Sequence, residues 1–377
     1  MRIAMIGAKG IATPAIQGGG IERHVELLAE RLANDGHKVT VYVRSYANPD
    51  NRKLWNGVKL RTIRTIRNKF LDTIIYALLA TLDSLRGDYE VIHFHGVGPS
   101  TLAWIPRLFK RHTKIFATFH SQDKLHEKWG MIARAYLAYG EWAACRFPHK
   151  TIAVSHGIQL FCQKMFGRDA IYIPNGVDIP TREPGTSHLK ALGLEPNGYF
   201  MTLGRLIPLK AHEVAIRAFK EIETDKKLLI IGEPSIYDVE YHAMLQELAR
   251  QDPRVVLMGF RSGEELKQLL AHSYCMIHPS RIEGLAIAIL EAMSFGKLVV
   301  MSDIPANREL VDHSGIAFPV GNVAKLRETL EWLLSDPVLV KVRGERAREA
   351  VRKFYSWEHV VRRTEGAYQA AIEGRNV

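Results

Sequence analysis

The sequence has few cysteines and no long apolar run. Its three cysteines, Cys145, Cys162 and Cys275, have no metal-ligand spacing, so we expect free, buried thiols rather than disulfides or a cysteine metal site. No run approaches the roughly 18 apolar residues that span a bilayer. The apolar start breaks at Gly7, before a signal-peptide core can form. We therefore expect a cytoplasmic protein.

Acidic residues are scarce in the first half, and this scarcity explains the net charge of +11. Residues 1–180 hold 25 Lys and Arg against 14 Asp and Glu, whereas residues 181–377 hold 26 of each kind. One stretch has seven bases and no acid: Arg52, Lys53, Lys59, Arg61, Arg64, Arg67 and Lys69. A second cluster is Arg107, Lys110, Arg111 and Lys114. We expect this half to meet the anionic inner face of a membrane; the alternative is an ordinary solvated basic face.

Short apolar runs alternate with helical patterns along both halves, which predicts parallel sheets covered by helices. Strands are expected near residues 2–7, 38–43, 57–63, 90–95, 114–120, 150–155 and 171–174, then 199–204, 227–232, 254–259, 274–279, 297–302 and 315–320. A Pro- and Gly-rich stretch at 174–185 separates the two series. A length of 377 residues also suits two domains. We predict an α/β protein with two Rossmann-like domains, 1–180 and 181–355, facing across a crevice.

One ionisable side chain interrupts the apolar stretch EGLAIAILEAMSFG at residues 283–296. Between Glu283 and Lys297 the sole charge is Glu291, and a carboxylate in an apolar helix is costly unless it is hydrogen-bonded. With a helix starting near Leu285, the two carboxylates would flank a helix N-terminus. That layout suits a nucleotide sugar, whose hydroxyl groups lie on either side of a diphosphate. The alternative is a core helix in which Glu291 bonds a backbone amide.

Two further stretches place phosphate-binding groups beside helix starts. Arg205 and Lys210 lie five residues apart at a strand-to-helix junction and predict a diphosphate clamp; a surface ion pair of Lys210 with Glu213 is the alternative. Gly18, Gly19 and Gly20 precede the first predicted helix, where glycines let backbone amides approach a phosphate, but a plain flexible loop fits equally well. The sequence lacks GxGxxG there, which argues against a dehydrogenase.

Three histidines lie on or at the ends of predicted strands. His93 and His95 alternate on one strand face, and His120 ends another strand, where it can hydrogen-bond a substrate hydroxyl or serve as a structural histidine. No nearby Cys or carboxylate completes a metal site with the histidine pair. The chain also contains no Asp-x-Asp to hold a diphosphate-bound cation. We therefore expect neither a metal nor a cofactor.

Taken together, these motifs resemble the retaining glycosyltransferases of family 4, which have the GT-B fold. The matching motifs are the glycine loop before the first helix, IPNGVD at 173–178, GRLxxxK at 204–210, MGF at 258–260 and EGLxxxxLEAM at 283–293. SWEHVV at 356–361 is similar to the tail helix that crosses back to the first domain, here about 356–377. The stretch TFHSQDKLHEKWG resembles a bacterial subgroup for surface-polysaccharide assembly. Ala211 and Ala286 depart from the family pattern, which usually has Gly at the first position and often Pro or Gly at the second.

The resemblance implies a role for each candidate residue. Glu291 would hold the ribose, and Gly259 and Phe260 would border the base. Gly18 to Gly20, Gly284 and the amides of Leu285 and Ala286 would surround the diphosphate. Arg205 and Lys210 would neutralise the diphosphate as it leaves, while Glu283 and His120 would contact the transferred sugar. Acceptor binding is assigned to Glu22, His95, Asp123 and Lys124.

These observations predict a metal-independent retaining glycosyltransferase that moves a sugar from a nucleoside-diphosphate donor to a glycan or lipid-linked acceptor. The base and the sugar stay open. A GT-B sugar-nucleotide epimerase is the first alternative. The second is a non-enzymatic binder of lipid or nucleic acid, but the basic run at 52–69 is nearly free of the aromatic residues that stack bases, so no nucleic-acid partner is expected.

Overall fold

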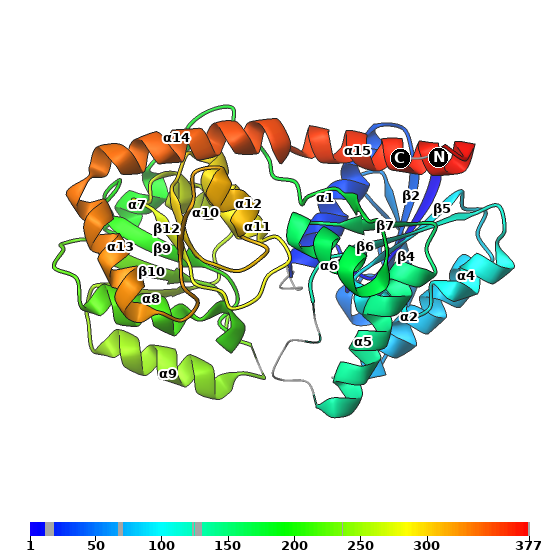
Figure 1. The fold of residues 1–377 in the computed structure, drawn as a ribbon, viewed down its shortest axis with the longest axis horizontal. Helices are drawn as coiled ribbons and strands as arrows, with labels where there is room; N and C mark the ends of the chain where they lie inside the picture. The colour runs from blue at the N-terminus through cyan, green and yellow to red at the C-terminus, as the bar shows by residue number, and fades with distance from the viewer. Residues whose placement is uncertain (12–18, 67–70, 123, 125–129, 236, 376–377) are drawn as a thin grey trace. The chain divides into compact units, whose positions relative to one another are not determined.

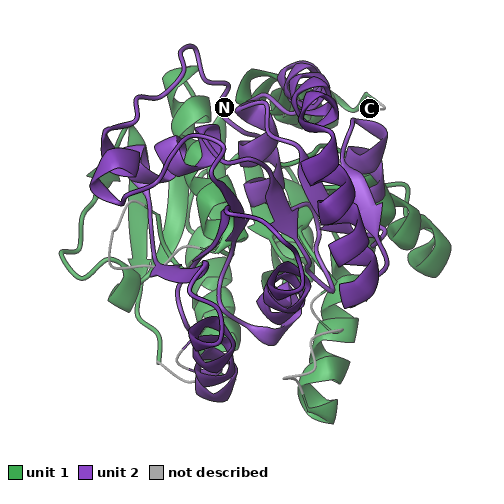
Figure 2. Cartoon of the chain, turned by 90° about the vertical axis from the view of Figure 1, so that its left-hand side faces the viewer, with its two compact units in different colours: residues 1–175, 357–377 green, residues 176–356 purple. Residues whose placement is uncertain are grey.

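The computed structural model describes residues 1–11, 19–66, 71–122, 124, 130–235 and 237–375. The chain divides into two compact units, Met1–Asn175 with Trp357–Val377 (unit 1) and Gly176–Ser356 (unit 2), shown in two colours in Figure 2. The first boundary therefore lies five residues before the predicted position at 180. The returning segment starts at Trp357, next to the predicted start at about 356.

Unit 1 is built on an eight-stranded sheet with the order β3-β4-β2-β1-β5-β6-β7-β8 (Figure 1). The strands are β1 Arg2–Ile6, β2 Lys38–Arg44, β3 Leu54–Trp55, β4 Val58–Ile63, β5 Val91–His95, β6 Lys114–Phe119, β7 Lys150–Ala153 and β8 Ile171–Tyr172. All neighbours are parallel except β3 and β4, which are joined by Asn56 and Gly57 with φ of 43° and 79°. Asn-Gly favours this two-residue hairpin turn, so the short antiparallel strand β3, which the apolar pattern did not predict, had a sequence signal of its own.

The helices of unit 1 cover both faces of this sheet. They are α1 Gly20–Asn34, α2 Leu71–Ser84, α3 Val97–Ser100, α4 Trp104–Phe109, α5 Met131–Arg146, α6 His156–Phe166 and α15 Trp357–Glu373, with a 3₁₀ turn η1 at Ser45–Ala47. The strand order reverses at β1, since β2 lies on one side of β1 and β5 on the other. Right-handed crossovers then place α1 on one face and α2 to α5 on the opposite face.

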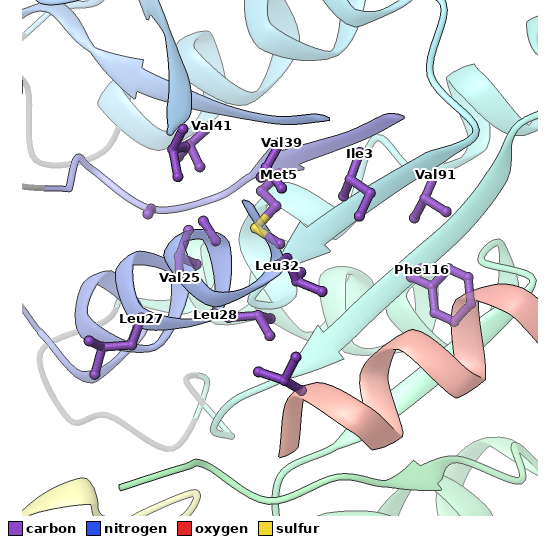
Figure 3. Packing of buried hydrophobic residues seen from close by; sticks show 14 of the residues in the cluster. Ile3, Met5, Val25, Leu27, Leu28, Leu32, Val39, Val41, Val91 and Phe116 are labelled. Atoms are coloured by element: carbon purple, nitrogen blue, oxygen red, sulfur yellow. The ribbon is translucent and has the colours of Figure 1, made fainter. Parts of the chain in front are cut away.

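The core of unit 1 includes side chains from both ends of the chain. Ile3, Met5, Leu28 and Phe116 belong to one buried apolar cluster, part of which is shown in Figure 3. The C-terminal helix α15 adds Trp357, Val360, Val361 and Tyr368 to the same cluster. Each fully buried apolar side chain of this size contributes roughly 1.5–3 kcal/mol. The last helix of the chain is therefore part of the first domain.

Unit 2 has a six-stranded parallel sheet with the order β11-β10-β9-β12-β13-β14. Its strands are β9 Tyr199–Leu203, β10 Lys227–Ile231, β11 Val255–Gly259, β12 Met276–His278, β13 Val299–Ser302 and β14 Ile316–Phe318. Its helices are α7 Ser187–Ala191, α8 His212–Lys220, α9 Val239–Arg250, α10 Gly263–Ala271, α11 Ile287–Ser294, α12 Arg308–Asp312, α13 Val323–Ser335 and α14 Pro337–Phe354, with a 3₁₀ turn η3 at Pro208–Lys210. Here the order reverses between β9 and β12.

Every strand predicted from the apolar runs is present, so the prediction of two parallel α/β domains is confirmed. The cysteines are also free and buried, as expected. One helix differs from its prediction. The apolar helix that carries Glu291 begins at Ile287 and not near Leu285, because Ala286 keeps an extended backbone, with φ of −74° and ψ of 114°. That φ also suits proline, the residue frequent at this position in the family that the sequence resembles.

Candidate active site

In open parallel sheets, ligands bind beyond the carboxyl ends of the strands, at the point where the strand order reverses. In unit 2 this point lies between β9 and β12. Lys210 follows β9 through the turn η3, and His278 is the last residue of β12, five residues before Glu283. The topology thus brings GRLxxxK and the start of EGLxxxxLEAM to one place, although they are some 70 residues apart in sequence.

The Glu283 carboxylate is held between two nitrogen groups at this point. Lys210 Nζ forms a short ion pair with Glu283 Oε1, and His278 Nε2 lies 2.9 Å from the same oxygen. Ser280 Oγ lies 3.0 Å from His278 Nε2. The Lys210 side chain is 21% exposed and that of Glu283 12%, so the pair borders solvent. For Lys210 the sequence left two alternatives, a diphosphate clamp and a surface ion pair with Glu213. The ion pair with Glu213 is wrong, because Glu213 bonds Arg281 and Tyr241 instead.

Lys210 and His278 keep Glu283 ionised. Burial alone would raise the pKa of the Glu283 carboxyl, but the Lys210 ammonium and the hydrogen bond from His278 hold this pKa well below its usual value. Burial lowers the pKa of His278 and outweighs the opposing effect of Glu283. The site therefore presents a cation and a fixed anion side by side near neutral pH, next to a helix start. Such a set can bind a phosphate and orient a hydroxyl group.

The other predicted donor residues lie along the same edge of the unit 2 sheet. Gly259 ends β11, and Phe260 follows it with an exposed ring. Arg205 follows β9; its side chain is exposed and forms no ion pair within the described part of the chain. Gly284, Leu285 and Ala286 are buried and lead into α11. Glu291 is half-buried beside the buried Leu290 and Ala292.

In unit 1 the strand order reverses between β1 and β5, and buried histidines gather there. His24 lies on α1, His95 ends β5, and His120 follows β6. His95 Nδ1 is 3.3 Å from His120 Nε2, and the His24 and His120 rings are 4.8 Å apart between centroids. Gly7, directly after β1, allows the close approach of β5, because a Cβ there would lie 2.2 Å from the His95 carbonyl oxygen.

Burial lowers the pKa of every imidazole in this cluster. The pKa of His24 falls to about 4, that of the neighbouring His93 to about 3, and those of His95 and His120 lie well below the usual value. His93 is fully bonded, to Tyr368 Oη at 2.6 Å and to Thr118 Oγ1 at 2.7 Å. In contrast, His24 Nδ1 and His95 Nε2 have no hydrogen-bond partner among the described residues. The cluster is therefore neutral near pH 7 and keeps unused hydrogen-bonding capacity.

This cluster corrects one step of the sequence argument about metals. We expected nothing to complete a site with the strand histidines, but the fold adds His24 and His120 to His95, with ligand atoms within 4.8 Å of one another. Three imidazoles can hold a zinc-like ion. To bind one zinc ion, the histidine nitrogens would have to move closer together, because two nitrogens on one zinc are at most about 4.2 Å apart. Metal independence thus stays a prediction.

The predicted acceptor residues are only partly brought together. His95 lies in the histidine cluster. Glu22 Oε1 instead accepts a hydrogen bond of 3.1 Å from the Lys9 amide, in the loop after β1. Gly19 and Gly20 lead into α1. Lys124 forms a 2.6 Å ion pair with the fully buried Glu141, which engages the ammonium that we assigned to the acceptor. Gly18 and Asp123 lie outside the described residues.

Two residues of these sites were missed in the sequence. His278 ends a predicted strand just before Glu283, and His24 follows the glycine loop by four residues. Both had the signal that served for His120, a histidine at or next to a strand or helix terminus. His278 has its partners Ser280 and Glu283 close by in the sequence, whereas the histidines that His24 meets come from other elements of the fold.

The two units define a protein of the doubly wound α/β class, and comparisons with known proteins identify its family. Residues 18–180 match the model described as "Glycosyltransferase Family 4", and residues 197–336 match that of "Glycosyl transferases group 1". The phosphatidyl-myo-inositol mannosyltransferase of Mycolicibacterium smegmatis is 26% identical, over 96% of this chain and 91% of its own. The gpi3 subunit of the Schizosaccharomyces pombe phosphatidylinositol N-acetylglucosaminyltransferase is 22% identical, over 96% and 80%.

Solved structures agree with this assignment at the level of the fold. Sucrose-phosphate synthase from Thermosynechococcus elongatus superposes with a TM-score of 0.84 at 20% identity, covering 99% of both chains. Anabaena HepE in complex with UDP and glucose superposes with a TM-score of 0.80 at 19% identity, over 98% of this chain and 100% of its own. The chain therefore belongs to glycosyltransferase family 4, has the GT-B fold and is a glycosyltransferase.

Proposed function

We propose that the protein is a retaining glycosyltransferase that takes its sugar from a nucleoside diphosphate and needs no metal. The observation that carries the proposal is the Lys210–Glu283–His278 group at the reversal point of unit 2. When the glycosidic bond of such a donor breaks, negative charge develops on the leaving diphosphate. Preorganised cations stabilise that charge most where they need not rearrange. Lys210 and the exposed Arg205 supply two such cations on one loop.

We assign the remaining unit 2 residues to the donor by their chemistry. Glu283, kept ionised by its neighbours, accepts hydrogen bonds from hydroxyl groups of the transferred sugar. Glu291, half-buried on α11, does the same for the ribose, and the exposed Phe260 ring borders the base. Amides at the start of α11 face the diphosphate. The leaving phosphate then takes the proton of the incoming acceptor hydroxyl, so this chemistry needs no covalent nucleophile from the protein.

We place the acceptor on unit 1 and propose a glycan or a lipid-linked glycan, made at the inner face of a membrane. The neutral imidazoles of His95 and His120 support this, because they can bond uncharged hydroxyl groups without attracting the donor phosphates. Two relatives are named as transferases of phosphatidylinositol, which supports a lipid-linked acceptor. None of the described helices is both long and apolar enough to cross a membrane.

The chemistry is tested with purified protein in excess EDTA. UDP, GDP, dTDP and ADP sugars are ranked by thermal shift, and the best donor is followed for slow hydrolysis and for transfer. We expect Lys210→Ala, Arg205→Ala and Glu291→Ala each to lower transfer at least a hundredfold, because each removes a charged contact to the donor. The control is Lys325→Ala, an exposed unit 2 lysine paired with Glu328, which should transfer normally.

Two results would overturn parts of this proposal. Loss of wild-type activity on chelation, restored by Zn²⁺ or Mg²⁺, would contradict the metal-free mechanism. Conversion of the donor sugar to its epimer in the absence of acceptor would contradict transfer and support an epimerase.

A further inference from the structure

One layer of unit 1 differs from the other in what it shows to solvent. Helices α2, α3, α4 and α5 follow strands that progress in one direction across the sheet, so they form a single layer, in which α3 packs against both α2 and α5. Helices α1 and α15 pack together on the opposite face (Figure 1). Because both layers cover the same sheet, the side chains that they expose to solvent can be compared directly.

The outer face of the first layer is unusually apolar. Leu108 and Phe109 at the end of α4 are 61% and 70% exposed. The other large apolar side chains exposed on this face include Leu78, Leu79, Leu82, Trp104, Tyr139 and Trp142. On the opposite layer, Ile372 is the sole exposed large apolar residue of α1 and α15 within the described part of the chain. Several large apolar side chains exposed on one layer are typical of an interaction site.

The aromatic side chains of this face join α4 to α5. Trp104, Leu108, Tyr139 and Phe147 line a hollow of about 260 Å³ together with Arg107. The Trp142 ring lies 5.6 Å from that of Tyr139 and 5.2 Å from that of Phe147, between centroids. Tryptophan and tyrosine with one apolar and one polar end are the side chains enriched at the boundary between lipid and water.

Among the described residues of α2, α4 and α5, the charged side chains classed as exposed are all cations. Arg111, Arg134 and Arg146 are exposed and form no ion pair among the described residues. The acids of the same helices are turned to partners: Asp72 bonds Arg44, Asp83 bonds Arg61, and Glu141 is fully buried against Lys124. An apolar face with cations and no free acid complements an anionic surface.

We propose that the outer face of the α2, α4 and α5 layer binds the headgroup region of an anionic bilayer. The inference rests on the proposed function, since it states where unit 1 would meet the membrane that carries the acceptor. It also moves the contact away from the basic run at 52–69, in which Arg61 is paired with Asp83 and Arg52 with Asp50. A second copy of the chain fits this face poorly, because a symmetric contact would set its cations against the same cations.

The test is co-sedimentation with phosphatidylcholine vesicles, with and without about one third phosphatidylglycerol. We expect wild-type protein to bind the anionic vesicles at least tenfold more tightly than the neutral ones. The double variant Leu108→Ser with Phe109→Ser should lose at least tenfold. The double variant Arg111→Gln with Arg146→Gln should lose about fivefold per base, the ratio that corresponds to roughly 1 kcal/mol per cation near the surface. Its residual binding should depend less on salt than that of the wild type.

The matched control is Val338→Ser with Val342→Ser on α14, two exposed apolar residues of unit 2, and it should bind like the wild type. Equal binding of the Leu108 and Phe109 variant and the wild type would overturn the proposal. So would a wild-type dimer that this variant converts to a monomer, which would identify a second copy as the occupant.

Donor hydrolysis without vesicles separates this inference from the proposed function. Retained hydrolysis in the surface variants, with circular dichroism like the wild type, assigns a loss of vesicle binding to the face itself. Vesicle binding with the expected pattern in a protein that hydrolyses no donor would leave the membrane face standing and overturn the transferase mechanism.

Discussion

The two points at which strand order reverses have the same topology, but one carries charged side chains and the other carries neutral ones. In unit 2, Lys210, Glu283 and His278 form a charged group that borders solvent. In unit 1, His24, His95 and His120 form a buried cluster in which burial keeps the imidazoles uncharged. The difference shows that one fold element can be adapted to two tasks. A paired cation suits a ligand with developing charge, whereas neutral imidazoles suit hydroxyl groups.

The largest expected effect is a loss of folding stability at low pH, which tests whether the histidines of unit 1 are neutral in the folded protein. His24 and His93 have folded pKa values of about 4 and 3, below the 6.5 of an unfolded histidine. The unfolded chain therefore binds more protons below pH 6.5, so stability is lost as pH falls. At pH 5 each of these two histidines costs roughly 2 kcal/mol relative to pH 7.5. His95 and His120 shift in the same direction and add to this loss.

Urea unfolding of the whole chain at pH 7.5 and pH 5, followed by fluorescence, measures this loss of stability. The variant His93→Gln should show a smaller decrease between the two pH values than the wild type, because one titrating group is gone. A decrease that is the same in both proteins would show that His93 is not held neutral.

The next effect tests whether His278 positions Glu283 in the charged group. His278→Ala should lower kcat by about ten- to a hundredfold with a smaller change in KM, because Glu283 loses the hydrogen bond that orients it. His278→Gln, which keeps a donor, should recover part of this loss. The acid limb of the pH profile should also move to higher pH in His278→Ala, since the pKa of Glu283 rises when the hydrogen bond is lost.

The control for this prediction is His242→Ala on α9, away from the reversal point. A pH profile unchanged in His278→Ala, together with a normal kcat, would show that Lys210 alone fixes the carboxylate.

The smallest expected effect concerns the turn that carries Lys210. Ala211 has φ of 50° and ψ of 39°, a left-handed conformation that strains any residue with a Cβ, and it is buried. Ala211→Gly should raise the free energy of unfolding by about 0.5–1 kcal/mol, because relief of this strain outweighs the lost methyl contacts and the added freedom of the unfolded chain. The matched control, Ala215→Gly inside α8, should lower it by at least about 1 kcal/mol. Equal losses in the two variants, measured by urea unfolding, would show that the turn is unstrained.

Much of this architecture could be predicted from the sequence. Short apolar runs and their flanking helical patterns predicted every strand except β3, because a strand buried on both faces of a parallel sheet is apolar throughout. The positions of Arg205, Lys210 and Glu283 at strand ends could be inferred for the same reason. The sequence shows that position 211 is Ala where the family usually has Gly. It does not show that Ala211 has a left-handed backbone, because φ depends on how the chain turns into α8.

What only the tertiary structure decided is which of these residues meet. Lys210 could have paired with Glu213, three residues away, and instead pairs with Glu283, because the reversal of strand order sets the ends of β9 and β12 side by side. His24 joins His95 and His120 for the corresponding reason at β1 and β5. Sequence patterns determine elements because they act over a few residues. The contacts of a site depend on strand order, which is a property of the whole domain.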